Sequence, residues 1–400
     1  MRIAHYSDTP LHRADGVAQV VRLTTQLLRS AGDEVVVVAP SEASTNDFVA
    51  GCSAVRSVPF PGLDYRIPIF FSLRKAHSAV DVIHIHTLGP IGLSGIRGAI
   101  RSRTPIVITW HTDYVSYEEY YSEIGWAAKI WSILKMSRAK ASESQPGTSL
   151  VACALLNAMN AADAVIVLSE KSELQLSGMG VGTRVARLPS PVDVKVPLED
   201  EVARLRASLG LRSPAKVVLG VGRLRKEKSW DLLIQAFVQL RKNNPNSHLL
   251  LIGEGRHRAE LWRSVIGFGL QEHVTILQPV PHHQMGAVFA LADVLCHTSD
   301  TETQGLVLDE AECLGIPVVV TDPYLTMGGK RILSDKSPDG LADTLHRVIS
   351  GRTYRPQISA DAYNATQRYK SANYIIRLRN LYDQVSRPCS EAVEPPTSID

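Results

Sequence analysis

RIAHYSDTPLHRADGVAQVVRLTTQLLRSAGDEVVVVAP, residues 2–40, contains the pattern that decides the fold class. Two short runs rich in β-branched residues, 2–7 and 34–40, predict buried strands. Between them, the apolar residues of segment 17–32 recur on one helical face, and Gly32 suits a C-terminal cap. A strand, a helix and a strand in this order indicate a parallel, doubly wound sheet.

The same alternation continues along the chain and restarts near residue 216. Further strands are predicted at 81–86, 105–110, 163–169 and 184–189, and then at 216–222, 247–255, 273–279, 292–299 and 315–322. A segment rich in Pro and charge, 189–201, separates the two series and is expected to be a hinge. The sequence therefore predicts an α/β protein with two Rossmann-like domains that face a central cleft. The expected divisions are 1–190, 191–365, a C-terminal helix at 366–386 and a disordered tail at 387–400.

Composition excludes several classes of protein. The 400 residues carry a formal net charge of +3, and their Lys and Arg are scattered, which disfavours a nucleic-acid-binding surface. The five cysteines lie far apart without metal-ligand spacing, so we expect no disulfide framework or structural zinc and a cytoplasmic location. The first residues do not resemble a signal peptide, and no segment approaches 18 uncharged apolar residues. Any contact with a membrane is therefore expected to be peripheral, at its inner face.

Charged residues follow the predicted strands of the second domain, where parallel sheets bind their ligands. Arg223 and Lys228 come after strand 216–222. A planar guanidinium and a flexible ammonium group together suit a diphosphate. Glu302 and Glu310 lie on either side of Gly305, where a helix can begin and expose backbone amides to an anion. On that helix Glu310 could accept hydrogen bonds from two vicinal hydroxyls, as on a ribose. The alternatives are that Arg223 and Lys228 belong to a solvated basic turn and that Glu310 is a surface acid paired with a lysine.

Several segments of the sequence, taken together, resemble a known family. Segment 302–322 is similar to the E-x7-E motif of retaining glycosyltransferases of the GT-B fold, in the large family 4. Further matching blocks are 8–40, 81–95, 105–121 and 220–237, and the resemblance covers roughly residues 1 to 385. It implies the GT-B fold, with an acceptor-side N-terminal domain, a nucleotide-sugar-binding C-terminal domain and a C-terminal helix that crosses back to the first domain.

The activity implied by this resemblance is transfer of a sugar to a hydroxyl acceptor such as a lipid, a cyclitol or a saccharide. The donor would be a nucleotide-diphosphate sugar, with UDP-sugar ahead of GDP-mannose, and neither a metal nor a cofactor would be required. Retention would follow from attack on the leaving-group face, with a diphosphate oxygen as the base. Two alternatives stay open: a sugar-nucleotide epimerase or hydrolase on the same scaffold, and a non-catalytic sugar-nucleotide-binding protein.

The resemblance also implies a role for each matching residue. Glu310 would hold the ribose hydroxyls and Glu302 the hydroxyls of the transferred sugar. Arg223 and Lys228 would neutralise the diphosphate, and His111 would face the donor sugar and assist near the reacting centre. Further donor-binding candidates are Gly16, Gly253, Glu254, Gly305, Leu306 and Val307. The acceptor-side candidates are Asp8, Asp113, Tyr114 and Tyr117; for Asp113, Tyr114 and Tyr117, packing of the next helix is the alternative.

Some positions depart from the family pattern. Gln304 stands where an aromatic residue is usual, Glu312 replaces a Met, and Pro191 is expected to stiffen the hinge. The segment after residue 322 is shorter than its counterpart and lacks an obvious Gly-Gly-x-x-Glu loop. These departures put the detailed contacts to sugar and phosphate in doubt but leave the main constellation intact.

Three other features allow more than one interpretation. His84 and His86 share a strand face and could imitate a metal pair, although a structural or cleft-lining role is favoured and no metal site is predicted. His282 and His283 are expected to face solvent. Segment 126–141 has an apolar stripe with a basic edge, which suits either a core helix or peripheral membrane contact. The sequence leaves the acceptor and the oligomeric state open.

Overall fold

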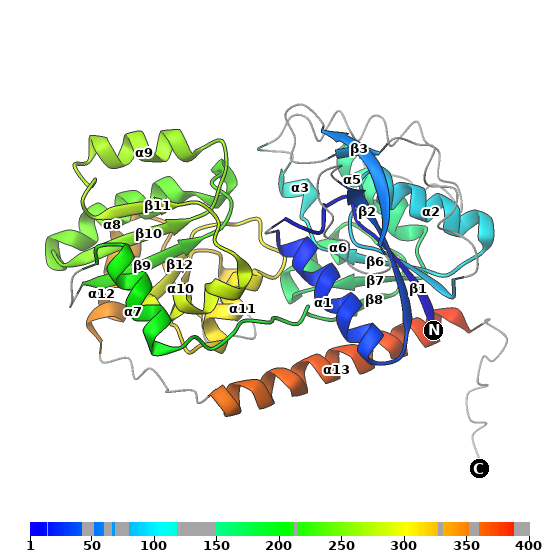
Figure 1. Ribbon diagram of the computed structural model, residues 1–400. Helices are drawn as coiled ribbons and strands as arrows, with labels where there is room; N and C mark the ends of the chain where they lie inside the picture. Colours follow the sequence, from blue (N-terminus) through cyan, green and yellow to red (C-terminus); the bar gives the residue numbers. More distant parts are fainter. Residues whose placement is uncertain are drawn as a thin grey trace, which may run out of the picture.

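The computed structural model describes residues 1–13, 15–41, 52–59, 66–68, 80–117, 120, 149–211, 215–326, 331–351 and 360–387. Two α/β domains lie side by side, and one long helix runs beneath both of them (Figure 1). The predicted interfacial segment 126–141 and the tail beyond residue 387 lie outside the described residues.

The N-terminal domain is built on an eight-stranded sheet with the order β4-β3-β2-β1-β5-β6-β7-β8. Its strands are β1 (Arg2–Tyr6), β2 (Glu34–Ser41), β3 (Cys52–Pro59), β4 (Arg66–Pro68), β5 (Val82–Ile85), β6 (Ile106–Trp110), β7 (Ala164–Val167) and β8 (Val185–Arg187). All neighbours are parallel except β3 and β4. The central strands are buried on both faces, as expected when helices cover a parallel sheet.

Helices cover this sheet on both sides: α1 (Gly16–Ser30), α2 (Pro90–Ser102), α3 (Tyr114–Tyr117), α5 (Leu150–Asn160) and α6 (Glu170–Gly178). Asp15 is the N-cap of α1, and its Oδ1 accepts hydrogen bonds from the amides of Val17 (2.9 Å) and Ala18 (3.3 Å). This cap fixes the start of α1 beside the interdomain crevice, so residues of its first turn can reach the other domain.

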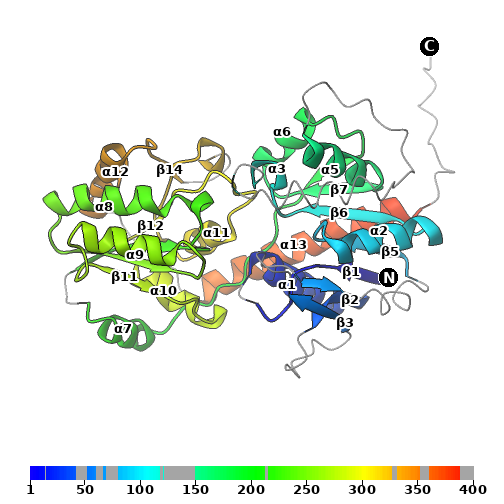
Figure 2. The same cartoon turned by 90° about the horizontal axis from the view of Figure 1, so that it is seen from above.

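The C-terminal domain has a six-stranded parallel sheet with the order β11-β10-β9-β12-β13-β14. Its strands are β9 (Lys216–Val221), β10 (Ser247–Ile252), β11 (Val274–Leu277), β12 (Val294–His297), β13 (Val318–Val320) and β14 (Ile332–Leu333). The surrounding α-helices are α7 (Glu199–Ser208), α8 (Trp230–Asn243), α9 (Arg258–Gly267), α10 (Met285–Leu291), α11 (Leu306–Cys313) and α12 (Pro338–Ser350). Short 3-10 turns are η2 (Lys226–Lys228), η3 (His282–Gln284) and η4 (Pro323–Thr326). The view from above shows this domain beside the first (Figure 2).

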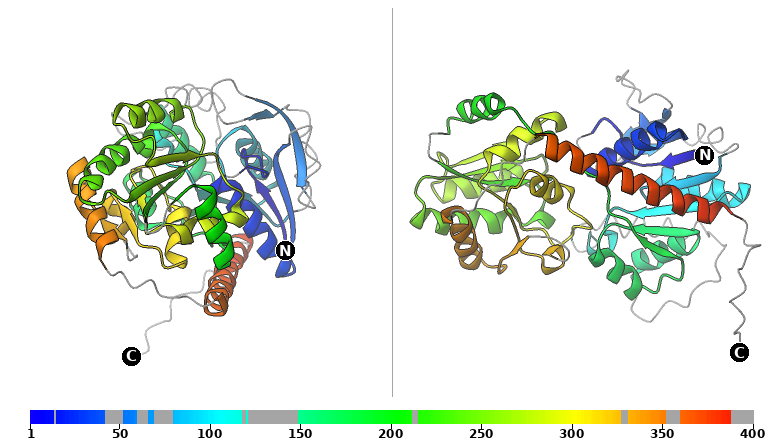
Figure 3. Two further views of the ribbon diagram at one scale, coloured as in Figure 1. Left: turned by 60° about the vertical axis from the view of Figure 1, so that its left-hand side comes forward. Right: turned by 90° about the horizontal axis from the view of Figure 1, so that it is seen from below.

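Helix α13 (Ala360–Ser386) crosses from the C-terminal domain to the N-terminal one (Figure 3). Tyr374 and Tyr382 on this helix are buried, and their hydroxyls lie 3.1 Å from Thr24 Oγ1 and 2.6 Å from His84 Nδ1. The helix begins six residues before the expected position 366, and its middle and end form part of the N-terminal core. Two Rossmann-like domains and a returning helix confirm the predicted architecture.

Candidate active site

The centre of the candidate site is an ion pair between Lys228 and Glu302, which are 74 positions apart in sequence. Lys228 closes the 3-10 turn that follows β9, and its backbone carbonyl accepts a hydrogen bond from Thr298 Oγ1 (2.7 Å). Glu302 follows β12, and His297 Nε2, at the end of that strand, lies 3.1 Å from its Oε1. Two adjacent parallel strands therefore deliver the cation, the acid and the imidazole to one edge of the sheet.

Opposing effects act on the charges of this pair. Burial disfavours the ionised form of Glu302, but Lys228 and the hydrogen bond with His297 outweigh it, so the pKa of the carboxyl lies well below its usual value. Burial likewise opposes the charge of Lys228, and the attraction of Glu302 raises the pKa of the ammonium above its usual value. Both groups are thus held charged in the crevice, ready to meet polar or anionic ligand groups.

Arg223 lies beside this pair and reaches the N-terminal domain. Its Nη2 donates a hydrogen bond to Tyr117 Oη (2.6 Å), and its guanidinium carbon lies 5.6 Å from the centre of the Tyr117 ring. The buried carboxylate of Glu227 is 3.7 Å from the same nitrogen. Tyr117, an acceptor-side candidate, therefore contacts the predicted diphosphate-binding arginine, and the structure brings Arg223, Lys228 and Glu302 to one crevice.

Helix α11 begins at the same crevice. Its N-cap Gly305 has the left-handed backbone angles φ 76° and ψ 66°, which a side chain would strain. A Cβ on Gly305 would also lie 2.8 Å from Leu308 Cδ1. The next residues, Leu306 and Val307, provide first-turn amides of the kind that bind anions. Across the crevice, a Cβ on Gly16 would meet Leu306 Cδ1 at 3.3 Å, so the two predicted glycine loops face each other.

Glu310 is buried on α11, and residues from both domains contact it. Gln19 Nε2 of α1 donates a hydrogen bond to its Oε1 (2.8 Å), and His282 Nε2 lies 3.1 Å from the same oxygen. The prediction that His282 faces solvent is therefore wrong, whereas His283 is exposed. A ribose hydroxyl that bound to Oε1 of Glu310 would compete with the Gln19 amide and with His282.

The glycine turn after β10 packs tightly against the turn after β9. A Cβ on Gly253 would lie 1.9 Å from the carbonyl oxygen of Gly222, and one on Gly255 would lie 2.1 Å from that of Leu224. The carbonyl of Glu254 accepts a hydrogen bond from the amide of Leu224 (2.8 Å). These glycines thus permit the close approach of two backbone segments. Contact of Gly253 and Glu254 with the donor stays a prediction.

His111 follows β6 and lies on the N-terminal side of the crevice. Its carbonyl oxygen accepts a hydrogen bond from Thr303 Oγ1 of the other domain (2.9 Å). Its ring is nearly parallel to that of His86, and its Nε2 lies 3.1 Å from His86 Nδ1. Burial lowers the pKa of His111 to about 3, so the ring is neutral. The imidazole can therefore donate one hydrogen bond and accept another.

Behind His111 lies a buried group of three histidines, His5, His84 and His86, whose ring nitrogens lie within 4.8 Å of one another. The metal pair considered from sequence thus gains a third residue from β1. Both nitrogens of His84 already have partners, Tyr382 Oη (2.6 Å) and Thr109 Oγ1 (2.7 Å). The predicted absence of a metal site stays a prediction.

Two acceptor-side candidates have structural roles instead. Asp8 is fully buried and accepts hydrogen bonds from Thr87 Oγ1 and the Ile91 amide, both at 2.7 Å, so it holds the start of α2. Asp113 is buried and accepts from Ser116 Oγ (2.5 Å) and from Gln175 Nε2 (2.7 Å). The structure therefore corrects the prediction that these two carboxylates face an acceptor. The ring of Tyr114 packs against that of Trp110, and their centres are 6.2 Å apart. This contact agrees with the alternative, a packing role.

Of the residues that depart from the family pattern, Gln304 connects the two domains and Glu312 pairs with Arg331 of its own domain. Gln304 Nε2 donates to the carbonyl of Ser190, and Gln304 Oε1 accepts from the Ser190 amide, both at 3.0 Å. This double hydrogen bond fixes the hinge beside Pro191. Glu312 lies 3.2 Å from Arg331 Nε. Gln304 thus holds the two domains together, a role that an aromatic side chain cannot fill.

Sequence reasoning missed a further interdomain pair. Lys171 of α6 is buried and lies 2.5 Å from Asp322, which follows β13. It also donates to the carbonyl of Asp300. A charged residue within an amphipathic helix gives no sequence signal of such a partner, since Asp322 is 151 positions away.

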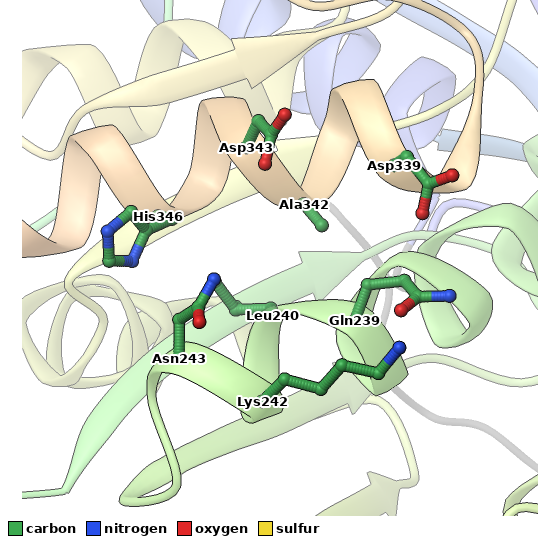
Figure 4. Close-up of a pocket in the computed structure, with 8 residues that line it drawn as sticks. All are labelled: Gln239, Leu240, Lys242, Asn243, Asp339, Ala342, Asp343 and His346. Atoms are coloured by element: carbon green, nitrogen blue, oxygen red, sulfur yellow. The ribbon is translucent and has the colours of Figure 1, made fainter.

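A separate hollow lies on the outside of the C-terminal domain, between α8 and α12 (Figure 4). Polar side chains such as Gln239, Lys242, Asp339 and His346 line it. None of the predicted site residues contributes to this hollow. The residues of the candidate site lie elsewhere, where the loops after β9 and β12 approach Tyr117 of the N-terminal domain.

Two models of known families match successive parts of the chain. Residues 14–196 match the model described as Glycosyltransferase Family 4, and residues 201–365 match the one described as Glycosyl transferases group 1. No described helix is long and apolar enough to cross a membrane.

Individual proteins show similarity over most of the chain or over part of it. The chain is 26% identical over 395 residues to the Alpha-monoglucosyldiacylglycerol synthase of Acholeplasma laidlawii, covering 96% of each chain. It is 34% identical over 170 residues to the GDP-mannose-dependent alpha-(1-6)-phosphatidylinositol monomannoside mannosyltransferase of Mycolicibacterium smegmatis, covering 40% of this chain and 44% of the other. Sucrose-phosphate synthase from Thermosynechococcus elongatus superimposes with a TM-score of 0.72 at 20% identity, covering 96% of this chain and 99% of that one. HepE of Anabaena, in complex with UDP and glucose, has a TM-score of 0.72 at 18% identity, covering 96% of this chain and 100% of that one.

Proposed function

Because the chain belongs to the family 4 glycosyltransferases and has the GT-B fold, we propose that it transfers a sugar, with retention and without a metal ion, from a nucleotide-diphosphate sugar to a lipid hydroxyl. The observation that carries this proposal is the meeting of Lys228, Glu302 and Arg223 in the crevice between the two domains. This set offers two cations for a diphosphate and one carboxylate for sugar hydroxyls.

Lys228 and Arg223 supply the electrostatic part of the reaction. When the bond between sugar and diphosphate breaks, negative charge accumulates on the leaving phosphate oxygens, and preorganised cations stabilise that charge more in the transition state than in the ground state. Lys228 would turn from Glu302 to the phosphate, and the first-turn amides of α11 would add hydrogen bonds. Two protein cations can perform this task without a metal.

Glu302 and Glu310 orient the donor. The low pKa of Glu302 keeps it ionised, so it can accept hydrogen bonds from sugar hydroxyls once Lys228 contacts the diphosphate. Glu310 would accept from the ribose after Gln19 moves aside. With both ends of the donor held, the acceptor hydroxyl attacks from the leaving-group face, and a diphosphate oxygen takes its proton.

The lipid acceptor is supported by the relatives of this chain. The relative that matches 96% of both chains is named for a diacylglycerol product. We place UDP-sugar first as the donor. The GDP-mannose-dependent relative matches only 40% of this chain, which puts GDP-mannose second.

The test is a matrix of donors and acceptors with the purified protein. UDP-glucose, UDP-galactose and GDP-mannose are each mixed with dispersed diacylglycerol, a glucosylated diacylglycerol, inositol phosphate or no acceptor, with and without EDTA. Mass spectrometry should detect a glycosylated lipid, NMR should show the donor's anomeric configuration, and EDTA should not reduce the yield. Arg223→Ala serves as the inactive control.

Other outcomes identify the rival functions. Nucleotide release without acceptor indicates a hydrolase, and a changed sugar indicates an epimerase. Binding of a donor without turnover on any acceptor indicates a sugar-nucleotide-binding protein and refutes the proposal.

A further inference from the structure

The histidines behind the crevice form a hydrogen-bonded chain that ends at His111. His86 Nδ1 lies 3.1 Å from His111 Nε2, and His86 Nε2 lies 3.3 Å from His5 Nδ1. His5 and His86 are buried, on β1 and directly after β5, at the carboxyl edge of the N-terminal sheet. The hydrogen-bonded chain of imidazoles therefore runs from His5 in the core, through His86, to His111 at the crevice.

All three rings are neutral in this environment. Burial lowers the pKa of His5 and of His111 to about 3 and that of His86 well below its usual value. A neutral imidazole carries one N–H donor and one acceptor nitrogen. Two directions of the chain are thus possible, and each direction fixes the tautomer of every ring.

The inner end of the chain distinguishes the two directions. His5 Nε2 is buried and has no hydrogen-bond partner among the described residues. If the chain ran inward from His111, His5 Nδ1 would accept and Nε2 would be a buried N–H without a partner, which is the rarer and costlier arrangement. If the chain runs outward, His5 Nδ1 donates to His86, His86 Nδ1 donates to His111 Nε2, and only an unpaired acceptor stays in the core.

We propose that His5 and His86 are positioning residues that hold His111 in the tautomer with a proton on Nδ1 and so aim an N–H donor at the donor sugar. His111 Nε2 is then the acceptor of the chain, and Nδ1 makes no hydrogen bond to a described residue, which leaves it for a ligand. The carbonyl of His111 accepts a hydrogen bond from Thr303 of the other domain, so His111 lies at the interface between the domains. The role toward the sugar rests on the proposed function, whereas the tautomer does not.

The first measurement is a long-range proton–nitrogen NMR spectrum of the imidazoles in the whole protein. His111→Gln identifies the signals of residue 111 by their disappearance. The expected result is the Nδ1–H tautomer for His111 in the unaltered protein. The Nε2–H tautomer would overturn the proposal whatever the activity of the protein.

The second measurement breaks and restores the chain at His86. In His86→Leu, His111 should lose its preference for the Nδ1–H form, whereas His86→Asn should retain it, because the amide can still donate to Nε2. His84→Asn is the matched control: His84 is on the same strand and equally buried, but its partners are Tyr382 and Thr109. It should leave the His111 tautomer unchanged.

Binding separates positioning from general damage to the fold. His86→Leu should weaken binding of the nucleotide sugar about 3- to 10-fold, as for one lost hydrogen bond, and leave binding of the free nucleotide diphosphate unchanged. His86→Asn should recover most of this loss. Equal weakening of both ligands would contradict the proposal, and an unaltered protein that binds no nucleotide sugar would refute the proposed function while the NMR result still decides the tautomer.

Discussion

Replacement of Lys228 by Met tests the centre of the site most directly. Met keeps the length of the side chain but removes the cation that pairs with Glu302. If Lys228 stabilises the departing diphosphate, its loss should cost about 2.7 to 4 kcal/mol of transition-state stabilisation, as for a removed oxyanion donor, and lower kcat about 10²- to 10³-fold. The measurement is release of the nucleotide diphosphate at saturating donor and acceptor.

The same change should also lower stability, because it leaves a carboxylate without its cation. The side chains of Lys228 and Glu302 are 8% and 18% exposed, which makes this a largely buried pair. Removing one partner of such a pair costs about 3 to 5 kcal/mol, and the partial exposure favours the lower end. Chemical denaturation at pH 7.5 measures this loss.

The double variant Lys228→Met/Glu302→Gln separates the two effects. With neither charge present, the free energy of unfolding should return to within about 1 kcal/mol of the unaltered protein, whereas turnover should stay low. Lys336→Met is a matched control, because Lys336 pairs with Asp300 nearby but is 48% exposed; it should change stability by at most about 1 kcal/mol. Recovery of turnover in the double variant, or a loss of less than tenfold in Lys228→Met, would refute the assignment.

Two further predictions concern the ribose site and acid stability. Glu310→Gln should weaken binding of the nucleotide diphosphate about 10- to 100-fold, whereas Gln19→Ala should strengthen it about 2- to 10-fold because the amide no longer competes for Oε1; calorimetry measures both, and equal weakening would be inconsistent with a ribose site. Since the pKa values of the buried His5, His84 and His86 lie below 6.5 in the folded protein, they contribute stability above that pH which is lost as the pH falls. Between pH 7.5 and 5.5 each should cost about 1.4 kcal/mol, about 4 kcal/mol together, in urea unfolding, and a flat profile would contradict their neutral state.

The strands and helices that sequence predicted were those with strong periodicity. All nine of the further predicted strands, and both strands of segment 2–40, have counterparts in the sheets. Strand β3 and the edge strand β4 were missed because Pro and polar residues interrupt their alternation, and the edge strand β14 was missed because it has only two residues. The E-x7-E spacing and the glycine within it located α11 correctly, since a helix start after a strand is a local property.

Partners across the crevice were beyond the reach of local patterns. Gln19 and Glu310 are 291 positions apart, and Asp8 turned from an acceptor candidate into a helix cap because the fold places Thr87 and Ile91 beside it. His297 could have been suspected, because it lies in a predicted strand five residues before Glu302. Its role became visible only when the strand order placed Lys228 beside the same carboxylate oxygen.

By itself, the sequence determined two doubly wound domains, the family and the residues that carry charge, because periodicity, glycine turns and motif spacing are written in neighbouring positions. Only the tertiary structure decided which charges meet, which carboxylates hold helices, and in which order the histidines contact one another. The physical reason is that a pKa, a tautomer or an ion pair depends on burial and on distances of a few ångströms, and both arise when segments far apart in sequence pack together.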